Sequence, residues 1–175
     1  MGTRFEPRNA QLRDGRVVHL RAIAPSDEEE LLQAFERLGS EARYMRFMRV
    51  VREADRARLR AVLGAFPQRG LAIAATVPAD DGIDIVGSAT FIIGPTPDTC
   101  EFAISVVDAW AGAGLGRVLM ESLIGAARER GLRTMEGYVL AENEGMLRLA
   151  SRLGFSVTRH PDDFSLKVCR LTLAG

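Results

Sequence analysis

The order of apolar and polar positions divides the chain into a first part with helical spacing and a second part with strand-like alternation. After a short alternating stretch at 16–23, apolar residues recur every three or four positions, which is the period of an α-helix. From residue 70 onward the spacing becomes extended, and Gly, Asp and Pro residues separate the apolar runs. This change of period predicts one strand, then helices, then a group of strands.

Three helices are expected before residue 70. In the first, at 25–39, Ser26 and Glu29 have the spacing of a capping box, and Gly39 ends the pattern. Its apolar face consists of Leu31, Leu32, Phe35 and Leu38. A second helix is expected at 40–47. The third is centred on Leu59, Val62, Leu63 and Phe66.

The remainder predicts a sheet interrupted by two helices. The expected strands lie at 70–77, 84–93, 100–107, 133–140, 155–160 and 164–173. The first three follow one another through turn residues and predict an antiparallel meander. One helix starts at Leu115 and stops near Gly131, and another covers 143–154. The strand–helix–strand unit predicts a right-handed parallel crossover, so the expected fold class is a mixed α/β fold with an otherwise antiparallel sheet.

Composition fits one globular domain over residues 1–175, because 47% of the residues are hydrophobic and 26% are charged. The polar segment 1–13 is expected to be flexible or loosely packed. It lacks the apolar run of a leader, and no run in the chain approaches a membrane span, which favours a cytoplasmic protein. A formal net charge of zero gives no reason to expect nucleic acid or an anionic membrane as the main partner.

Cysteine and histidine usage argues against a metal centre. Cys100 and Cys169 lie far apart in apolar runs and are expected to be small buried side chains without a disulfide. His19 and His160 have no ligand-type partner at metal-binding spacing, so structural roles are favoured for both. We therefore expect no metal cofactor.

Three glycines, Gly112, Gly114 and Gly116, stand directly before the helix that starts at Leu115. The first N–H groups of a helix lack intrahelical partners, so glycines at this point let an anion approach the main chain closely. A plain flexible turn is the alternative. Arg117 occupies the last glycine position of a dinucleotide-binding fingerprint, and no P-loop string occurs, which excludes both of those phosphate motifs.

The stretch 100–155 resembles the GNAT superfamily of acyl-CoA-dependent N-acyltransferases. Its pyrophosphate loop has the pattern Q/R-x-x-G-x-G/A, which matches 111–116 here, and the strand "EGYVL", Asn143 and the "LGF" at 153–155 follow in the family's order. The stretch "SEARYMRF" at 40–47 is similar to Pat-type bacterial protein lysine acetyltransferase domains, so the resemblance extends over about 14–173. It implies a mostly antiparallel sheet with one splayed parallel strand pair, flanked by helices.

The resemblance also implies an acetyl-CoA site. The cofactor-binding residues carried over are Ile104, Val106, Gly112, Ala113, Gly114, Leu115, Gly116, Arg117 and Asn143. Ile104 and Val106 would contribute main-chain groups, with a nearby N–H polarising the thioester carbonyl. Arg117 would add a cation, although a solvated arginine is equally common at such a place. Asn143 fits a helix N-cap as well as a contact with CoA.

Two positions depart from the family pattern. The usual Gln or Arg at the start of the loop is Ala111, so one donor to the pyrophosphate is missing. A tyrosine that acts as general acid in many members is Ala150 here. With an amine pKa of about 10.4, deprotonation at pH 7 costs roughly 4.6 kcal/mol, whereas release of a thiolate costs only about 2 kcal/mol. A general base is therefore needed more than a general acid.

Glu101 is the candidate base. A carboxylate in the apolar strand 100–107 is unexpected, and alternation places it on one face with the small residues Ala103 and Ser105. Partial desolvation would raise its pKa towards neutrality. An ion-paired glutamate at a strand end is the alternative from the residues alone. Pat-type domains carry a catalytic glutamate here, and the resemblance implies that role for Glu101.

The resemblance implies transfer of an acetyl group from acetyl-CoA to an amine by direct attack, with a protein lysine as acceptor and acyl-CoA synthetases as candidate targets. Acetylation of a small-molecule amine and a non-catalytic CoA-binding regulatory module are the alternatives. Arg43, Tyr44 and Arg46 either line the acceptor entrance or form a solvated or ion-paired helix face, and the second is favoured. Trp110 is expected to pack beside the loop. A monomer and a homodimer both remain open.

Overall fold

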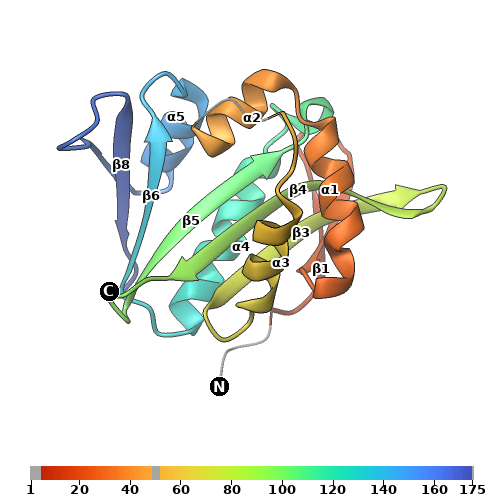
Figure 1. Ribbon diagram of the computed structural model, residues 1–175, viewed down its shortest axis with the longest axis horizontal. Helices are drawn as coiled ribbons and strands as arrows, with labels where there is room; N and C mark the ends of the chain where they lie inside the picture. The colour runs from red at the N-terminus through yellow and green to blue at the C-terminus, as the bar shows by residue number, and fades with distance from the viewer. Residues whose placement is uncertain (1–4, 49–51, 175) are drawn as a thin grey trace.

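The computed structural model of the chain describes residues 5–48 and 52–174, which are built around one eight-stranded sheet of order β1-β2-β3-β4-β5-β6-β8-β7 (Figure 1). The strands are β1 (Arg8–Gln11), β2 (Val17–Ala22), β3 (Gly70–Ala79), β4 (Gly82–Ile93), β5 (Thr99–Val106), β6 (Thr134–Leu140), β7 (Ser156–Arg159) and β8 (Leu166–Thr172). Neighbours pair antiparallel except β5 and β6, which are parallel. The predicted meander and the single parallel pair are confirmed.

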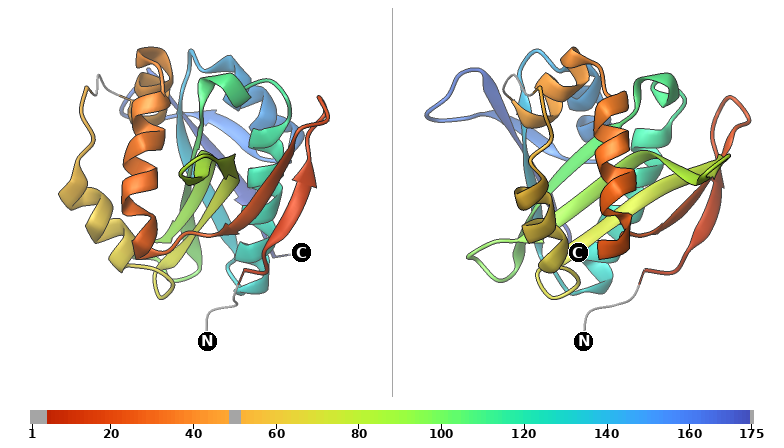
Figure 2. Two further views of the ribbon diagram at one scale, coloured as in Figure 1. Left: turned by 90° about the vertical axis from the view of Figure 1, so that its right-hand side faces the viewer. Right: turned by 45° about the vertical axis from the view of Figure 1, so that its right-hand side comes forward.

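Helices cover both faces of the sheet. They are α1 (Glu28–Arg37), α2 (Ser40–Phe47), α3 (Arg56–Gly64), α4 (Leu115–Glu129) and α5 (Glu144–Arg152). Figures 1 and 2 show α1 and α3 on one face and α4 on the other, with α2 near the end of β5. The apolar stripe of α4 is buried against the sheet, so the central strands β3 and β4 are covered on both sides.

The N-terminal segment contains a strand that the hydrophobic pattern does not predict. Residues 8–11, within the segment expected to be loosely packed, form β1 and pair antiparallel with β2. The strand is short and mostly exposed, so it has no apolar alternation to reveal it. Leu12, directly after it, is 4% exposed and belongs to the core. Backbone pairing and this one buried side chain hold the segment in place.

The helix start at 25–39 also differs from the prediction, because Ser26 and Glu29 do not form the capping box. Pro25–Asp27 is a short 3₁₀ turn, and α1 begins after it. The Asp27 carboxylate accepts hydrogen bonds from the Ala24 N–H and the Arg21 guanidinium, each at 2.8 Å. The contact between the Asp27 carboxylate and the Ala24 N–H therefore replaces the expected pair of Ser26 and Glu29, and the half-buried ion pair with Arg21 fixes that carboxylate.

The core contains both cysteines as small buried side chains. Cys100 and Cys169 are free thiols with exposures of 1% and 0%. Burial raises the pKa of the Cys100 thiol to about 12 and that of Cys169 to about 11. Neither is reactive as a thiolate at neutral pH. Within residues 5–48 and 52–174, no helix has the length and apolar character needed to cross a membrane.

Candidate active site

The parallel strands β5 and β6 pair over a short distance and then diverge. Their register covers Thr99–Glu101 opposite Thr134–Glu136 and no later residues of either strand in the described chain. Directly after the last pair, the ring of Phe102 lies against the backbone of Gly137, at a place that a Cβ atom would fill. Phe102 also makes an edge contact with Phe155, with ring centroids 5.3 Å apart. An aromatic side chain thus occupies the point where the strands separate.

The main chain of β5 faces the gap that this divergence leaves. Val107 N–H donates to Val86 O at 2.9 Å, in the same register that pairs Val106 with Gly87. Backbone groups alternate in direction along an antiparallel ladder. The N–H and C=O groups of Ile104 and Val106 therefore point away from β4 and towards the gap.

The glycine loop between β5 and α4 presents a row of unpaired N–H groups. Gly112 and Gly114 have φ angles of 82° and 92°, a region that favours glycine. Among the described residues, none of the six N–H groups of 112–117 has a hydrogen-bond acceptor. A Cβ on Gly116 would lie 3.4 Å from Leu149, so α4 and α5 approach closely here. These N–H groups, at a helix start, can bind an anion.

The hairpin between β1 and β2 holds this loop from outside. Arg13 donates from its guanidinium to Gly112 O at 3.0 Å and from its backbone N–H to Ala113 O at 3.1 Å. Each peptide unit has its C=O and N–H on opposite sides. Binding these two carbonyls therefore turns the N–H groups of Ala113 and Gly114 away from the hairpin. Motif reading missed Arg13, because it lies far from the loop in sequence.

A second arginine of the hairpin secures the turn before the loop. Arg16 donates to Ala109 O at 3.0 Å, and its guanidinium lies over the Trp110 ring at 4.0 Å. Arg16 is itself paired with Asp14 at 2.7 Å. Trp110 thus packs beside the loop, as expected from its place in the sequence.

The gap and the loop open into one cavity of about 770 Å³. The C-terminal part of β5, the loop, α2 and α5 contribute to its wall. The predicted site residues that line it are Glu101, Ile104, Val106, Gly112, Ala113, Gly114, Leu115, Gly116, Arg117 and Asn143. Ala111 and Trp110 line it as well. The structure therefore brings together, in one space, every residue that the sequence singled out for catalysis or cofactor binding.

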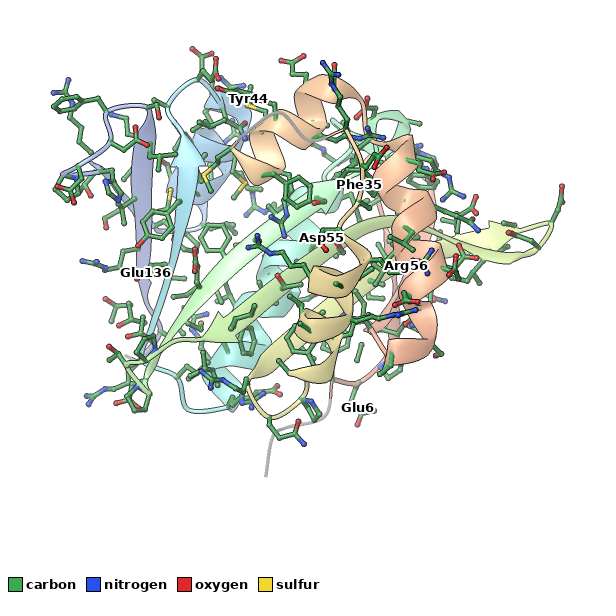
Figure 3. All side chains as sticks on the ribbon, in the orientation of Figure 1. Glu6, Phe35, Tyr44, Asp55, Arg56 and Glu136 are labelled. Atoms are coloured by element: carbon green, nitrogen blue, oxygen red, sulfur yellow. The ribbon has the colours of Figure 1, made fainter. Side chains whose placement is uncertain are left out.

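Glu101 lies at the point where the strands diverge, with its side chain accessible from the cavity. Glu136, labelled in Figure 3, is the residue paired with Glu101 in the parallel register. Partial burial of the carboxyl group and the negative charge of Glu136 raise the pKa of Glu101, while the positive charge of Arg46 opposes the rise. Among the described residues, Glu101 makes no side-chain hydrogen bond or ion pair. The ion-paired alternative is thus not what the structure shows.

Several other predicted residues have structural contacts. Asn143 caps α5, its side chain accepting from Met146 N–H at 3.2 Å, so it both caps a helix and lines the cavity. Arg117 pairs with Glu121 at 2.7 Å on the exposed first turn of α4. His19 bonds Asn9 at 2.8 Å, and His160 accepts two backbone N–H groups at 3.1 Å. These histidine contacts are the structural roles expected from the sequence.

Helix α2 contributes one of its three candidate side chains to the cavity. Arg43 instead donates to the carbonyls of Phe35, Glu36 and Arg52, and ties α2 to its neighbours. Arg46 lines the cavity. Tyr44 does not belong to the lining (Figure 3). The helix face is therefore divided between structural contacts and the site.

One residue of the lining was not singled out from the sequence. Tyr138, 36% exposed, lines the cavity from β6, two positions after Glu136 and so on the same face of that strand. The alternation in "EGYVL" contains this signal. Ala150, where many family members carry a tyrosine, is fully buried and lies outside the lining. Across 5–48 and 52–174, no cluster of three or more potential metal-ligating side chains occurs.

Comparisons with known proteins agree with this architecture. The model of the acetyltransferase (GNAT) domain matches residues 18–156. A protein named as an acetyltransferase from Pseudomonas aeruginosa is 35% identical over 93% of this chain and 87% of its own length. Acetyltransferase Pat of Mycolicibacterium smegmatis is 30% identical over 85% of this chain, which corresponds to 44% of that longer protein.

Solved structures show the same fold. The GNAT domain of PAT from S. lividans matches with a TM-score of 0.86 at 23% identity, covering 95% of this chain and 96% of that one. The yncA acetyltransferase of Salmonella typhimurium, solved with its cofactor acetyl-CoA, matches with a TM-score of 0.69 at 21% identity over 90% and 95% of the two chains. The family model, the Pseudomonas relative and the shared fold together identify this chain as a member of the GNAT acetyltransferase family.

Proposed function

We propose that this protein transfers an acetyl group from acetyl-CoA to an amine, with Glu101 as the general base. The observation that supports this most directly is that an anion-binding loop, outward-facing strand backbone and an unpaired carboxylate share one cavity. Each of the three suits a different part of the reaction. The loop suits the phosphates of CoA, the strand backbone suits the pantetheine arm, and the carboxylate suits the attacking amine.

The cavity fits CoA on its own geometry. The unpaired N–H groups of 112–117 would receive the pyrophosphate at the positive end of the α4 dipole. The outward-facing groups of Ile104 and Val106 would pair with the amides of the pantetheine arm, in the manner of an added strand. Asn143 lines the same wall and retains free hydrogen-bonding capacity on its amide NH₂.

The reaction is direct attack. The amine nitrogen forms a bond to the thioester carbonyl carbon, the carbon–sulfur bond breaks, and CoA leaves as a thiolate that takes a proton from solvent. Glu101 accepts the amine proton, directly or through one water. Its raised pKa suits this role, because a stronger base removes the amine proton more readily. The reaction can proceed without a tyrosine at the position of Ala150, because releasing the thiolate costs less free energy than deprotonating the amine.

A protein lysine is the proposed acceptor. The stretch 40–47, which is similar to Pat-type domains, forms α2 beside Glu101, and two of the matching proteins carry the name Pat. Acyl-CoA synthetases remain the first targets to test. Incubation with radiolabelled acetyl-CoA, a bacterial lysate and, separately, a panel of free amines tests the proposal. Label on protein lysines supports it; label only on small amines replaces the acceptor, and CoA binding without any transfer would identify a regulatory module.

In this proposal Arg13 compensates for the missing side-chain donor at Ala111 by ordering the loop, because the N–H groups that would bind the pyrophosphate point away from the hairpin. Its guanidinium lies at the loop, next to the place a Cβ on Gly114 would occupy, and holds Gly112 O. We expect Arg13→Gln to weaken CoA binding by roughly three- to tenfold, since a charge-assisted contact and an ordered loop are both lost. Calorimetry with CoA and dephospho-CoA checks this, and both should lose affinity equally because they share the pyrophosphate.

The matched control for Arg13 is Arg133→Gln, which removes an exposed arginine outside the cavity lining. Its affinity for CoA should equal that of the wild type. Adding Ala111→Arg to Arg13→Gln should restore part of the lost affinity by supplying the donor from the loop itself. Equal affinities for wild type and Arg13→Gln would show that the hairpin plays no part in cofactor binding.

The charge of Glu136 should shift the acid limb of the pH profile, in addition to the effect of partial burial of Glu101. Because Glu136 raises the pKa of Glu101, Glu136→Gln should lower that pKa. The base then stays ionised to lower pH, so the acid limb of kcat/KM moves to lower pH. Arg170 pairs with Glu136 at 3.0 Å, and Arg170→Gln should move the limb the opposite way by unmasking the repulsion. The test is to measure kcat/KM from about pH 5 to 9 with one acceptor for wild type, Glu136→Gln and Arg170→Gln. Identical acid limbs in all three proteins would contradict this role of Glu136.

A further inference from the structure

Arg46 of α2 is a charged side chain whose contacts with the described residues include no hydrogen bond. It lines the cavity, and its guanidinium lies 4.8 Å from the centroid of the Phe47 ring. Among the described residues, its N–H groups donate to no carboxylate or carbonyl. A guanidinium has five donors and stays protonated in proteins. Arg46 lines the cavity, and within residues 5–48 and 52–174 its donors have no acceptor.

The surroundings of Arg46 make this unusual. Packing of protein around the guanidinium lowers the pKa of Arg46, and the positive charge of Arg58 acts in the same direction. A charge removed from water is normally paired, because an unpaired buried charge is costly. Arg43, on the same helix, follows that rule by donating to three carbonyls. Arg46 has no such partner among the described residues.

Glu101 carries the charge opposite to that of Arg46, and each group shifts the pKa of the other electrostatically. They do not form an ion pair with each other, although both are described. Both line the same cavity, and Glu101 likewise lacks a side-chain partner. A molecule between them would meet a carboxylate and a guanidinium at once. That arrangement matches a group that carries both a positive and a negative charge.

We propose that Arg46 binds a carboxylate of the acceptor, so that the enzyme selects amines with a carboxylate close to the nitrogen that is acetylated. This rests on the proposed function, because the amine must be held at Glu101 for Arg46 to bind the carboxylate next to it. A protein lysine beside Asp or Glu and a free amino acid share this chemistry. Arg46 is thus a specificity-determining residue of the acceptor side, separate from the loop that holds the phosphates.

Unreactive conjugates that join CoA to an acceptor through an acetyl linker test this without turnover. The first pair joins CoA to the lysine Nε of a heptapeptide, with either Glu or Gln on both sides of the lysine. The second pair joins CoA to the Nα of glycine or of glycinamide. Within each pair only the carboxylate differs. Calorimetric Kd values of each conjugate, and of free CoA, are measured for wild type, Arg46→Gln, Arg46→Lys and Arg58→Gln.

We expect the wild type to bind the carboxylate member about tenfold more tightly in at least one pair, as a bidentate guanidinium contact would produce. The peptide pair identifies a lysine with acidic neighbours, and the glycine pair identifies a free amino acid. Arg46→Gln should abolish the preference while binding free CoA normally, and Arg58→Gln should keep it, because Arg58 contributes charge without lining the cavity.

Two results would overturn the inference: equal binding within both pairs by the wild type, or a preference that survives in Arg46→Gln. If Arg46→Gln lost affinity for free CoA through misfolding, Arg46→Lys would decide, since it keeps the charge but not the planar fork and should reduce the preference at least about threefold. If the wild type failed to bind free CoA, the proposed function itself would fall, and that outcome is distinct from equal binding within the pairs.

Discussion

Glu101→Gln should lower kcat by at least about tenfold while leaving CoA affinity unchanged, because general-base catalysis contributes about 10² to 10⁴ to the rate. The amide is nearly isosteric with the carboxylate but cannot accept the amine proton at neutral pH. The side chain is accessible and has no hydrogen bond among the described residues, so its replacement removes no internal contact. Initial rates with acetyl-CoA and the acceptor found by labelling give kcat, and calorimetry gives the Kd for CoA.

The pH dependence separates a lost base from a lost contact. With Glu101 as base, the acid limb of kcat reports its raised pKa: the rate falls as pH drops through that pKa, where the carboxylate takes up a proton. The limb should be absent in Glu101→Gln, which should gain rate at alkaline pH as the free amine fraction rises. Glu6→Gln, a remote exposed carboxylate (Figure 3), is the control and should match wild type. Unchanged turnover across pH in Glu101→Gln would remove the assignment.

The elements that the sequence predicts well are those with a strong hydrophobic period. Helix α4 buries a continuous apolar stripe, and β3, β4 and β5 are long apolar runs between turn residues, so burial and periodicity agree. Strand β1 could not be found this way, because it is an exposed edge strand held by backbone pairing. The start of α1 was also misjudged. There Asp27 is fixed by Arg21 on a neighbouring strand, a contact that local spacing does not encode.

The site residues likewise fall into those that local sequence spacing predicts and those that only the topology brings together. The cofactor loop and Glu101 lie on one continuous stretch, 101–117, where spacing and resemblance identify them together. Arg13 and Arg46 reach the same cavity from elements that are distant in sequence, and Glu136 comes next to Glu101 only through the parallel pairing of β5 with β6. Such contacts depend on topology, and a local pattern carries no signal for the partner. Tyr138 is the intermediate case, since alternation from Glu136 places it on the same strand face.

Gly137→Ala should destabilise the protein by about 1–3 kcal/mol, which is the usual cost of overpacking a core. A Cβ at this position would lie 2.6 Å from Cζ and 2.7 Å from Cδ1 of Phe102, and would also clash with Cε1. The ring cannot move freely, because Phe102 is 6% exposed and packs edge-on against Phe155. Thermal unfolding should show a Tm lower by roughly 3–10 °C for a chain of this size.

The same substitution at Gly125 is the control, because it separates the clash from the general effect of adding a methyl group. Gly125 lies inside α4, and a Cβ there would have nothing within 4 Å. Alanine is favoured over glycine in a helix interior by about 1 kcal/mol, so Gly125→Ala should raise the Tm slightly. A lower Tm for Gly137→Ala and a higher Tm for Gly125→Ala would show that the destabilisation comes from the contact between Phe102 and the β6 backbone. If Gly137→Ala were also stabilising, the ring would be free to shift, and Phe102 would not be what keeps β5 and β6 apart.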